Sequence, residues 1–268
     1  MIIFDHEVFA VSLVKFRKNG ITDPIKSASG FFYKTLNKLY FFTNRHVVID
    51  ENNEFFPDCL ELNLHTDRED LNKSKKFSIN LYEGDKKLWL EHPVGGKEID
   101  VVALNVDKNE IASKFHVEAF SEKDLLSPRR YISIGSDLLV VGYPLGIRDT
   151  KHKTPIIRSA IIASVYPLPF DGNPYFLIDS FLHNGTIGSP VLLKPSNIIR
   201  DINGRARLIQ DKKASFKRDL IGINSGAFIP TDWEPCEEEQ RMEKGCPRMG
   251  LNIVWFASLI PEILSGQS

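Results

Sequence analysis

Cysteine is scarce in this sequence. The 268 residues include three cysteines, Cys59, Cys236 and Cys246, and no C-x-x-C pair. Neither a disulfide-stapled secreted scaffold nor a zinc ribbon is therefore supported. Cys236 and Cys246 could pair, but reduced thiols are the simpler expectation. The histidines lack metal-ligand spacing with one another or with the cysteines, so we expect no metal site and no cofactor.

Long hydrophobic runs and a surplus of one charge are also missing. No apolar run approaches the ~18 residues of a membrane span. The first residues, Met1–Glu7, are acidic where a signal peptide would be basic. Lysine and arginine number 34 against 35 aspartates and glutamates, so no overall field draws the chain to nucleic acid or to an anionic membrane. We expect a cytoplasmic protein that binds no nucleic acid and no membrane.

Short apolar segments bounded by turn residues fill most of the chain. Many are rich in valine, isoleucine and phenylalanine, and several alternate with polar residues, which is typical of strands in sandwiches and barrels. The segments are Val8–Phe16, Phe31–Tyr33, Leu39–Thr43, Leu60–Leu64, Phe77–Leu81, Val101–Val106, Leu138–Tyr143, Ile156–Val165, Tyr175–Ile178, Val191–Leu193, Leu220–Ile223 and Ile253–Phe256. This pattern predicts an all-β protein.

Helical patterns are few. The clearest is Ala257–Leu264, and single turns are expected after Asn44 and near Glu122–Leu126. The polar stretch at 116–135, which contains Pro128, is the best candidate for a link between two halves of the chain. A C-terminal helix therefore completes the predicted all-β fold.

Two charged segments flank the predicted strand at Leu220. Residues 200–219 carry seven basic and three acidic side chains, whereas residues 232–244 carry six acidic and two basic ones. The simpler interpretation is a pair of solvated loops, of which one could pair with the other. The alternative is a surface for a substrate or for a regulatory protein partner.

Three segments carry residue types that fit nucleophilic acyl transfer. His46 follows an apolar run, Asp100 precedes another, and a glycine-punctuated loop, Gly185-Thr-Ile-Gly188-Ser-Pro190, leads into a third. This chemistry needs a base, a carboxylate that orients the base, and a nucleophile. Each segment alone is more often structural, as a core histidine, a turn carboxylate or a tight turn. Their order along the chain makes the set informative.

Taken together, the segments resemble the trypsin-like serine peptidases of the chymotrypsin double-barrel superfamily, in particular the bacterial branch related to the HtrA proteases. That family has the motifs T-N-x-H-V, D-[VIL]-A-[VL] and G-x-S-G-[GS]-P in this order. Thr43–Val47 matches the first motif, and Asp100–Leu104 matches the second with one inserted apolar residue. Further matches extend the resemblance over nearly the whole chain: Ser29–Phe31, Val141–Gly146, Ile221–Ser225 and Gly250–Ala257.

The resemblance implies a fold and a substrate class. We expect two six-stranded antiparallel β-barrels and a short C-terminal helix at about 257–265. Lobe 1 would span about 1–115 and lobe 2 about 130–257, and the two would form one peptidase unit with the cleft between them. The substrate would be a peptide or a protein, and no cofactor is implied.

The resemblance also implies catalytic roles. His46 would be the general base, and Asp100 would orient it. The backbone N–H groups of Gly185 and Ile187 would form the oxyanion hole, since main-chain donors survive a change of side chain. Ser225 could hydrogen-bond Asp100.

Substrate binding would fall to residues that follow the same family pattern. Ser225, Gly226 and Ala227 would offer an edge strand that pairs with an extended peptide. Phe181 lies near the position that forms the floor of the primary specificity pocket, and an aromatic ring there favours an apolar substrate side chain. His183 is expected to be a wall residue of the same loop.

The match fails at the nucleophile, because Ile187 stands where the family has its serine. An isoleucine has no lone pair with which to attack a carbonyl carbon, and its branched side chain is larger than serine and stiff at χ1. Thr186 and Ser189 are close in sequence, but neighbouring side chains in an extended or tight-turn segment point in different directions. We therefore expect activity near background.

Two functions remain open from the sequence. In the first, the chain is a serine endopeptidase in an inactive form, in which Ile187 replaces the nucleophile. In the second, it is a natural pseudopeptidase that binds an extended peptide or a protein partner in the same cleft. Retention of His46 and Asp100 favours the first weakly, because a buried charged pair is costly to keep without a use.

Overall fold

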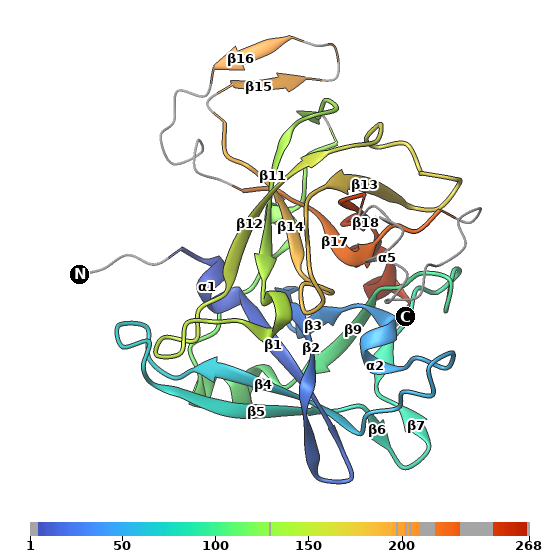
Figure 1. Ribbon diagram of the computed structural model, residues 1–268. Coiled ribbons are helices and arrows are strands. Elements are labelled where there is room, and N and C mark those ends of the chain that lie inside the picture. The colour runs from blue at the N-terminus through green and yellow to red at the C-terminus, as the bar shows by residue number, and fades with distance from the viewer. Residues whose placement is uncertain are drawn as a thin grey trace, which may run out of the picture.

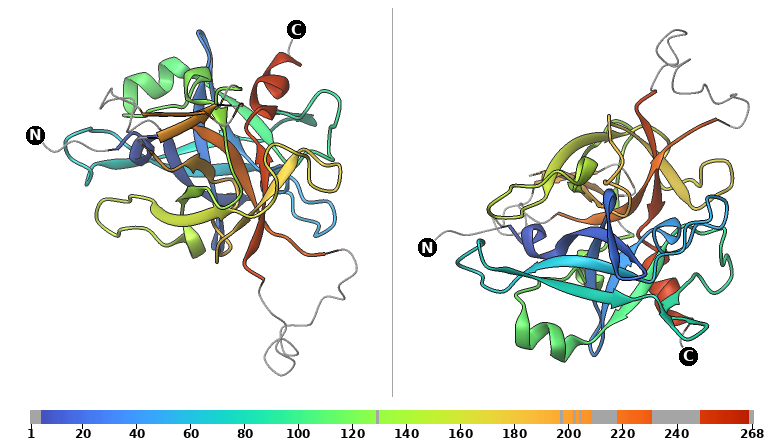
Figure 2. Two further views of the ribbon diagram at one scale, coloured as in Figure 1. Left: turned by 90° about the horizontal axis from the view of Figure 1, so that it is seen from above. Right: turned by 60° about the horizontal axis from the view of Figure 1, so that its bottom comes forward.

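The computed structural model describes residues 5–128, 130–196, 198–201, 203, 205–208, 218–230 and 249–266. Strands dominate, and they form two lobes that lie one above the other (Figure 1). The two lobes are also seen one above the other in the right-hand view of Figure 2. In the part of the chain that is described, no helix is long and apolar enough to cross a membrane.

The first lobe is a curled antiparallel sheet of seven strands in the order β5-β4-β1-β2-β3-β9-β8. A separate hairpin, β6–β7, connects β5 to β8. The strands are β1 (Val11–Lys18), β2 (Ile21–Lys34), β3 (Leu39–Thr43), β4 (Cys59–His65), β5 (Ser74–Asn80), β6 (Tyr82–Glu83), β7 (Lys86–Lys87), β8 (Trp89–Leu90) and β9 (Val102–Val106).

The second lobe is a closed six-stranded barrel in the order β11-β12-β13-β18-β17-β14. Its strands are β11 (Asp137–Gly142), β12 (Ile156–Ile162), β13 (Tyr175–Asp179), β14 (Pro190–Leu193), β17 (Leu220–Ala227) and β18 (Leu251–Phe256). A small sheet made of β10 (Arg130–Tyr131), β15 (Ile198–Asp201) and β16 (Ala206–Leu208) projects from it at the top of Figure 1.

Helices are short, as the sequence predicts. They are α1 (Glu7–Ala10), α2 (Arg45–Val48), α3 (Lys108–Lys114), η1 (Glu122–Asp124), η2 (Pro144–Gly146) and α5 (Leu259–Ser265). Helix α5 follows the last strand of the second lobe but contacts β9 of the first. A hydrogen-bonded pair, His92 Nε2 to Glu262 Oε2 at 3.0 Å, fixes α5 in that position.

Three clusters of buried apolar side chains hold the lobes together. One fills the first lobe, one fills the second, and a third joins side chains of both lobes with those of α5. Strand β3 contributes to two of these clusters, and all five of its residues are buried. Phe41 faces the interior of the first lobe, whereas its neighbours Tyr40 and Phe42 belong to the cluster between the lobes. The two lobes are therefore joined by a buried apolar cluster.

The expected all-β, chymotrypsin-like architecture is confirmed, with differences in detail. The main sheet of the first lobe has seven strands and does not close, where a six-stranded barrel was expected. The predicted strand at Val8–Phe16 begins only at Val11, because Glu7–Ala10 forms α1 and packs Phe9 against the rings of His65 and His116. Helix α3 was not predicted, although Asp107 caps it by accepting from Asn109 N and Glu110 N.

Some predictions concern residues outside the described part of the chain. The acidic segment at 232–244 lies there, as do Cys236 and Cys246. Of the basic segment at 200–219, the described residues include the hairpin of β15 and β16, where a loop was expected. Cys59, the described cysteine, is buried and is not in a disulfide.

Candidate active site

The turn after β3 brings His46 to Asp100. Strand β3 pairs with β9, and Thr43 lies opposite Val102. The residues just after β3 and just before β9 are therefore neighbours, although they are far apart in sequence. Asn44 locks this arrangement, because its Nδ2 donates to the backbone oxygen of Asp100 at 2.6 Å. His46 then falls in the single helical turn of α2, beside the Asp100 carboxylate.

Asp100 is the centre of a hydrogen-bonded group that spans both lobes. Its Oδ2 lies 2.8 Å from His46 Nδ1, and its Oδ1 accepts from the backbone N–H of His46 at 2.9 Å. From the second lobe, Ser225 Oγ donates to the same Oδ2 at 2.5 Å. The pairing of β17 with β18 skips Ser225, and such a bulge re-aims a side chain. The structure thus brings together three residues that the sequence grouped.

His46 is held so that its protonated form is favoured. Burial opposes a positive charge on the ring, but the hydrogen bond and the charge of Asp100, together with the charge of Asp50, outweigh burial. The pKa of His46 consequently lies above its usual 6.5. Folding therefore stabilises the protonated ring, so the stability from this pair is complete below pH 6.5 and is lost as the pH rises through the raised pKa.

An NMR titration of the His46 ring in the unmodified chain is expected to give a midpoint above 6.5. Replacing Asp100 with asparagine should move the midpoint downward, because burial lowers the pKa of His46 and the carboxylate that raises it is gone. Ser225→Ala is the matched control, since it removes a neighbour of Asp100 and keeps the carboxylate. A midpoint that is unchanged in Asp100→Asn would contradict this account of the electrostatics.

The glycine-punctuated loop crosses from the second lobe to the first. Gly185 and Gly188 have φ angles of 95° and 83°, which side chains rarely adopt. Between them, Ile187 is half-buried and packs against the apolar cluster of the first lobe. A Cβ placed on Gly226 would lie 3.6 Å from Ile187 Cγ1, so the isoleucine side chain also lies close to the start of the predicted substrate strand.

Two backbone N–H groups of this loop remain open. Thr186 N donates to His183 O, Gly188 N donates to Asn224 O, and Ser189 N donates to Thr186 O. By contrast, the N–H groups of Gly185 and Ile187 have no hydrogen-bond acceptor among the described residues. These are the two donors that the sequence assigned to an oxyanion hole.

Two residues that the sequence analysis missed hold the loop in place. Ser29, fully buried, donates from its N–H to Ile187 O at 2.7 Å and from its Oγ to Gly185 O at 2.7 Å. Asn224, also fully buried, donates from Nδ2 to Thr186 O at 2.9 Å. Ser29 and Asn224 lie in segments that the motif comparison covered. Nothing in those motifs indicates that their side chains bind the backbone of a loop that is distant in sequence.

Gly188 is expected to be among the residues most sensitive to substitution. A Cβ at this position would overlap Ser29 O and Thr43 Oγ1, and the positive φ adds strain. Gly188→Ala should lower the free energy of unfolding by about 3 kcal/mol. Gly172→Ala is the matched control, because Gly172 has a φ of 77° but nothing within 4 Å of the added Cβ. Its loss should be about 1 kcal/mol, from strain alone. Equal losses in urea melts would show that the close contact is not what matters.

The other hydroxyl-bearing residues of the loop are buried. Thr186 is buried, and its Oγ1 donates to His183 O at 2.8 Å. Ser189 is fully buried, and its hydroxyl lies against Gly142 of the second lobe. Neither arrangement offers a hydroxyl to His46. His183 itself is exposed.

The residues predicted to bind substrate lie at the surface. Ser225 and Gly226 are partly exposed and Ala227 is exposed. Phe181 is 60% exposed, and a Cβ on Gly250 would lie 3.7 Å from its ring. The role of Phe181 as the floor of a specificity pocket stays a prediction. Among the described residues, no group of three or more His, Cys, Asp or Glu could hold a metal ion.

Arg45, beside His46, anchors α2 from the other side. Its guanidinium donates to both oxygens of Glu51 at 2.7 and 2.8 Å and to Glu91 at 2.9 Å. The hydrogen bonds to Glu51 are the main reason that the pKa of Arg45 is raised. The carboxylates on either side therefore keep this buried charge paired, and α2 is fixed on both faces.

Comparisons with known proteins agree with this geometry. The sequence matches no curated protein. Among solved structures, the fold is similar to a thermostable serine protease, AL20, from an extremophilic microorganism. The TM-score is 0.52 at 11% identity, and the match covers 97% of this chain and 96% of the other. At 11% identity, this similarity shows a shared fold and nothing about activity.

The sequence also matches a protein family directly. Residues 28–198 match the trypsin-like peptidase domain family, which is more than half of the chain. The matched range contains His46, Asp100 and the whole 185–188 loop, and the solved structure independently carries the same fold. The chain therefore belongs to the trypsin-like peptidase domain family.

Proposed function

We propose that the chain is a trypsin-like serine endopeptidase in an inactive form, in which Ile187 replaces the nucleophilic serine. The observation that carries the proposal is the hydrogen-bonded group of His46, Asp100 and Ser225 beside a loop whose backbone donors are intact. A base, its orienting carboxylate and two free N–H groups are all that the reaction needs besides a nucleophile. The substrate is a peptide or a protein.

Each retained part has a role in the proposed reaction. His46 would take the proton of an attacking hydroxyl through Nε2, because Nδ1 is held by Asp100 at 2.8 Å. Asp100 would keep that tautomer and stabilise the imidazolium that forms. The N–H groups of Gly185 and Ile187 would stabilise the oxyanion of the tetrahedral intermediate. The missing step is the attack itself, since Ile187 has no lone pair.

Both lobes are needed in this proposal, so residues 1–268 act as one peptidase unit. His46 and Asp100 come from the first lobe, and Ser225 and the loop come from the second. We also propose that the chain belongs to the bacterial branch related to the HtrA proteases, which the match of Thr43–Val47 to T-N-x-H-V supports.

The second candidate is a pseudopeptidase that binds an extended peptide in the same cleft. The packing of Ile187 against the first lobe favours this alternative, because the side chain fills space beside Gly226 and joins the lobes through apolar contact. The edge of β17 at Ser225–Ala227 would then pair with the peptide without cleaving it.

Treatment of the Ile187→Ser variant and the unmodified chain with a fluorophosphonate probe separates these candidates. The proposal expects labelling at position 187 in the variant and none in the unmodified chain, as mapped by mass spectrometry of the digested protein. A variant that folds, yet takes no label and cleaves no member of a peptide library, would favour the binding module. Labelling of Ser189 or Thr186 in the unmodified chain would overturn the assignment of Ile187 to the nucleophile position.

A further inference from the structure

The sheet of the first lobe leaves a seam between β5 and β9. Strand β5 pairs with β4 along its length, and in the described part of the chain no strand pairs with its other edge. Strand β9 pairs with β8 only at Ala103 and Leu104, so Asn105 and Val106 extend beyond β8. The two sides meet at one end, where Leu88 N donates to Leu81 O at 3.0 Å. Open strand edges of this kind can accept another strand.

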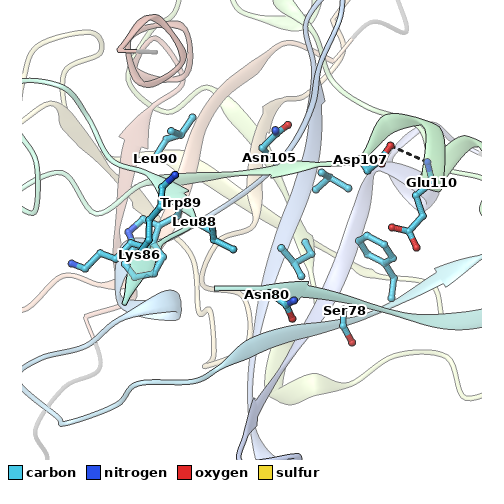
Figure 3. Close-up of a pocket in the computed structure, with 13 residues that line it drawn as sticks. Ser78, Asn80, Lys86, Leu88, Trp89, Leu90, Asn105, Asp107 and Glu110 are labelled. Carbon is cyan, nitrogen blue, oxygen red and sulfur yellow. Dashed lines mark hydrogen bonds between the residues drawn. The ribbon is translucent and has the colours of Figure 1, made fainter. Parts of the chain in front are cut away.

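The seam is hollow along its length. One cavity of about 460 Å³ lies between β5 and the β7–β9 region, and a second of about 520 Å³ lies between β5 and α3. Phe77, Ser78 and Glu110 line both cavities, so the two form one groove along the edge of β5. Figure 3 shows Ser78 and Asn80 on one side of the groove, and Leu90, Asn105 and Asp107 on the other.

The floor of the groove is apolar. Ile79, Trp89 and Val106 line it and belong to the buried cluster of the first lobe. Phe77 packs on Phe115, with ring centroids 5.6 Å apart, at the α3 end. Alternate residues of a guest strand point to opposite faces of the sheet, so every second side chain would contact this floor.

The rim of the groove is basic. Five lysines and two carboxylates line the two cavities: Lys75, Lys76, Lys86, Lys87, Lys114, Asp107 and Glu110. Both carboxylates are already engaged, because Asp107 caps α3 and Glu110 pairs with Lys114 at 2.8 Å. Lys76 pairs with Glu61, whereas Lys75, Lys86 and Lys87 have no carboxylate within 4 Å among the described residues. Lys87 Nζ also lies 5.2 Å from the centroid of the Trp89 ring, and its charge acts on Glu51. The positive charge of Lys75 and Lys86 therefore favours an acidic partner.

We propose that the seam binds an extended segment of a partner protein, in which acidic residues alternate with apolar ones, as an added strand. Backbone hydrogen bonds to the edge of β5 would supply affinity. Apolar side chains on the inner face would contact the floor, and an acidic residue at the end of that face would meet Lys75, which lies on the same face of β5 as Phe77 and Ile79. The acidic residues at the rim would lie toward Lys86 and Lys87. The groove shares no residue with the His46–Asp100 site, so the proposal stands whether or not the cleft is catalytic.

Binding of a short peptide in which glutamate alternates with valine and isoleucine tests the proposal by fluorescence anisotropy. The acidic peptide is expected to bind, and a peptide with lysine in place of glutamate is not. Hydrogen exchange at the backbone amides of β5 should slow when the acidic peptide is bound. Methylation of the backbone nitrogens that donate to β5 should abolish binding, because it removes the N–H groups of those hydrogen bonds. Methylation of the alternate nitrogens should not.

Charge-reversal variants locate the site. The triple variant Lys75→Glu, Lys86→Glu, Lys87→Glu should raise the Kd by about tenfold or more. The matched control Lys34→Glu, Lys151→Glu, Lys194→Glu carries the same change in net charge at exposed lysines elsewhere, and should leave the Kd within about twofold. The proposal is wrong if the acidic peptide does not bind, if both triple variants weaken it equally, or if sedimentation shows the free chain dimerising through this edge.

Discussion

Replacing Ile187 with serine is expected to raise peptide-bond hydrolysis by about 10³-fold or more over the unmodified chain. The substitution supplies the hydroxyl that the site lacks and removes the branched side chain beside Gly226. The rest of the machinery is in place, because His46 is already bonded to Asp100 and the N–H groups of Gly185 and Ile187 have no partner among the described residues. The measurement is kcat/KM on a peptide selected from a library.

Ile187→Ala is the control for this gain. Alanine also removes the bulky side chain but supplies no nucleophile, so its activity should stay near that of the unmodified chain. If alanine gave the same increase as serine, the gain would come from opening the cleft to water rather than from a hydroxyl at position 187. Urea melts of both variants are needed, because both lose the contact of Ile187 with the core of the first lobe.

Asp100→Asn, made in the Ile187→Ser background, is expected to lower kcat by about 10⁴-fold. An asparagine amide can donate to His46 Nδ1, which would leave the ring proton on Nε2 and block its action as a base. The hydrogen bond from His46 N to Oδ1, at 2.9 Å, can persist with an amide oxygen, so the fold should tolerate the change.

Ser225→Ala in the same background provides the comparison. It removes one donor to the Asp100 carboxylate and leaves the charge, so kcat should fall by only about tenfold. Equal losses in the two variants would indicate that Asp100 acts only as part of a structural network. The rate of the Ile187→Ser variant should also rise with pH around a midpoint above 6.5, since protonated His46 cannot accept a proton.

Much of the fold could be predicted from local pattern. The apolar run Val101–Val106 became β9 at Val102–Val106, and the helix expected at Ala257–Leu264 became α5 at Leu259–Ser265. These elements follow from side-chain periodicity, which is a property of the segment itself. The open edge of β5 could not be predicted in this way, because whether a sheet closes depends on pairing between strands that are far apart in sequence.

The candidate site was predictable to the extent that its residues lie in motifs. His46, Asp100 and Ser225 each lie in a recognisable segment, and the structure brings the three together across the two lobes. Ser29 was missed because it acts through a hydrogen bond from its own side chain to the backbone oxygen of Gly185, 156 residues away. Such contacts leave no periodic or compositional signal, since any small polar residue would look the same in the sequence.

The order of the strands along the chain determines when each lobe can fold during synthesis. All seven strands of the main sheet of the first lobe have been synthesised by Val106, so that sheet can form early. The barrel of the second lobe cannot close until β18, at Leu251–Phe256, inserts between β13 and β17. Only after that can α5 reach back to β9. During synthesis, the face of the first lobe that carries His46 and Asp100 would therefore stay exposed until the second lobe folds. A chaperone would be most useful in this interval, because exposed apolar surface is prone to aggregate.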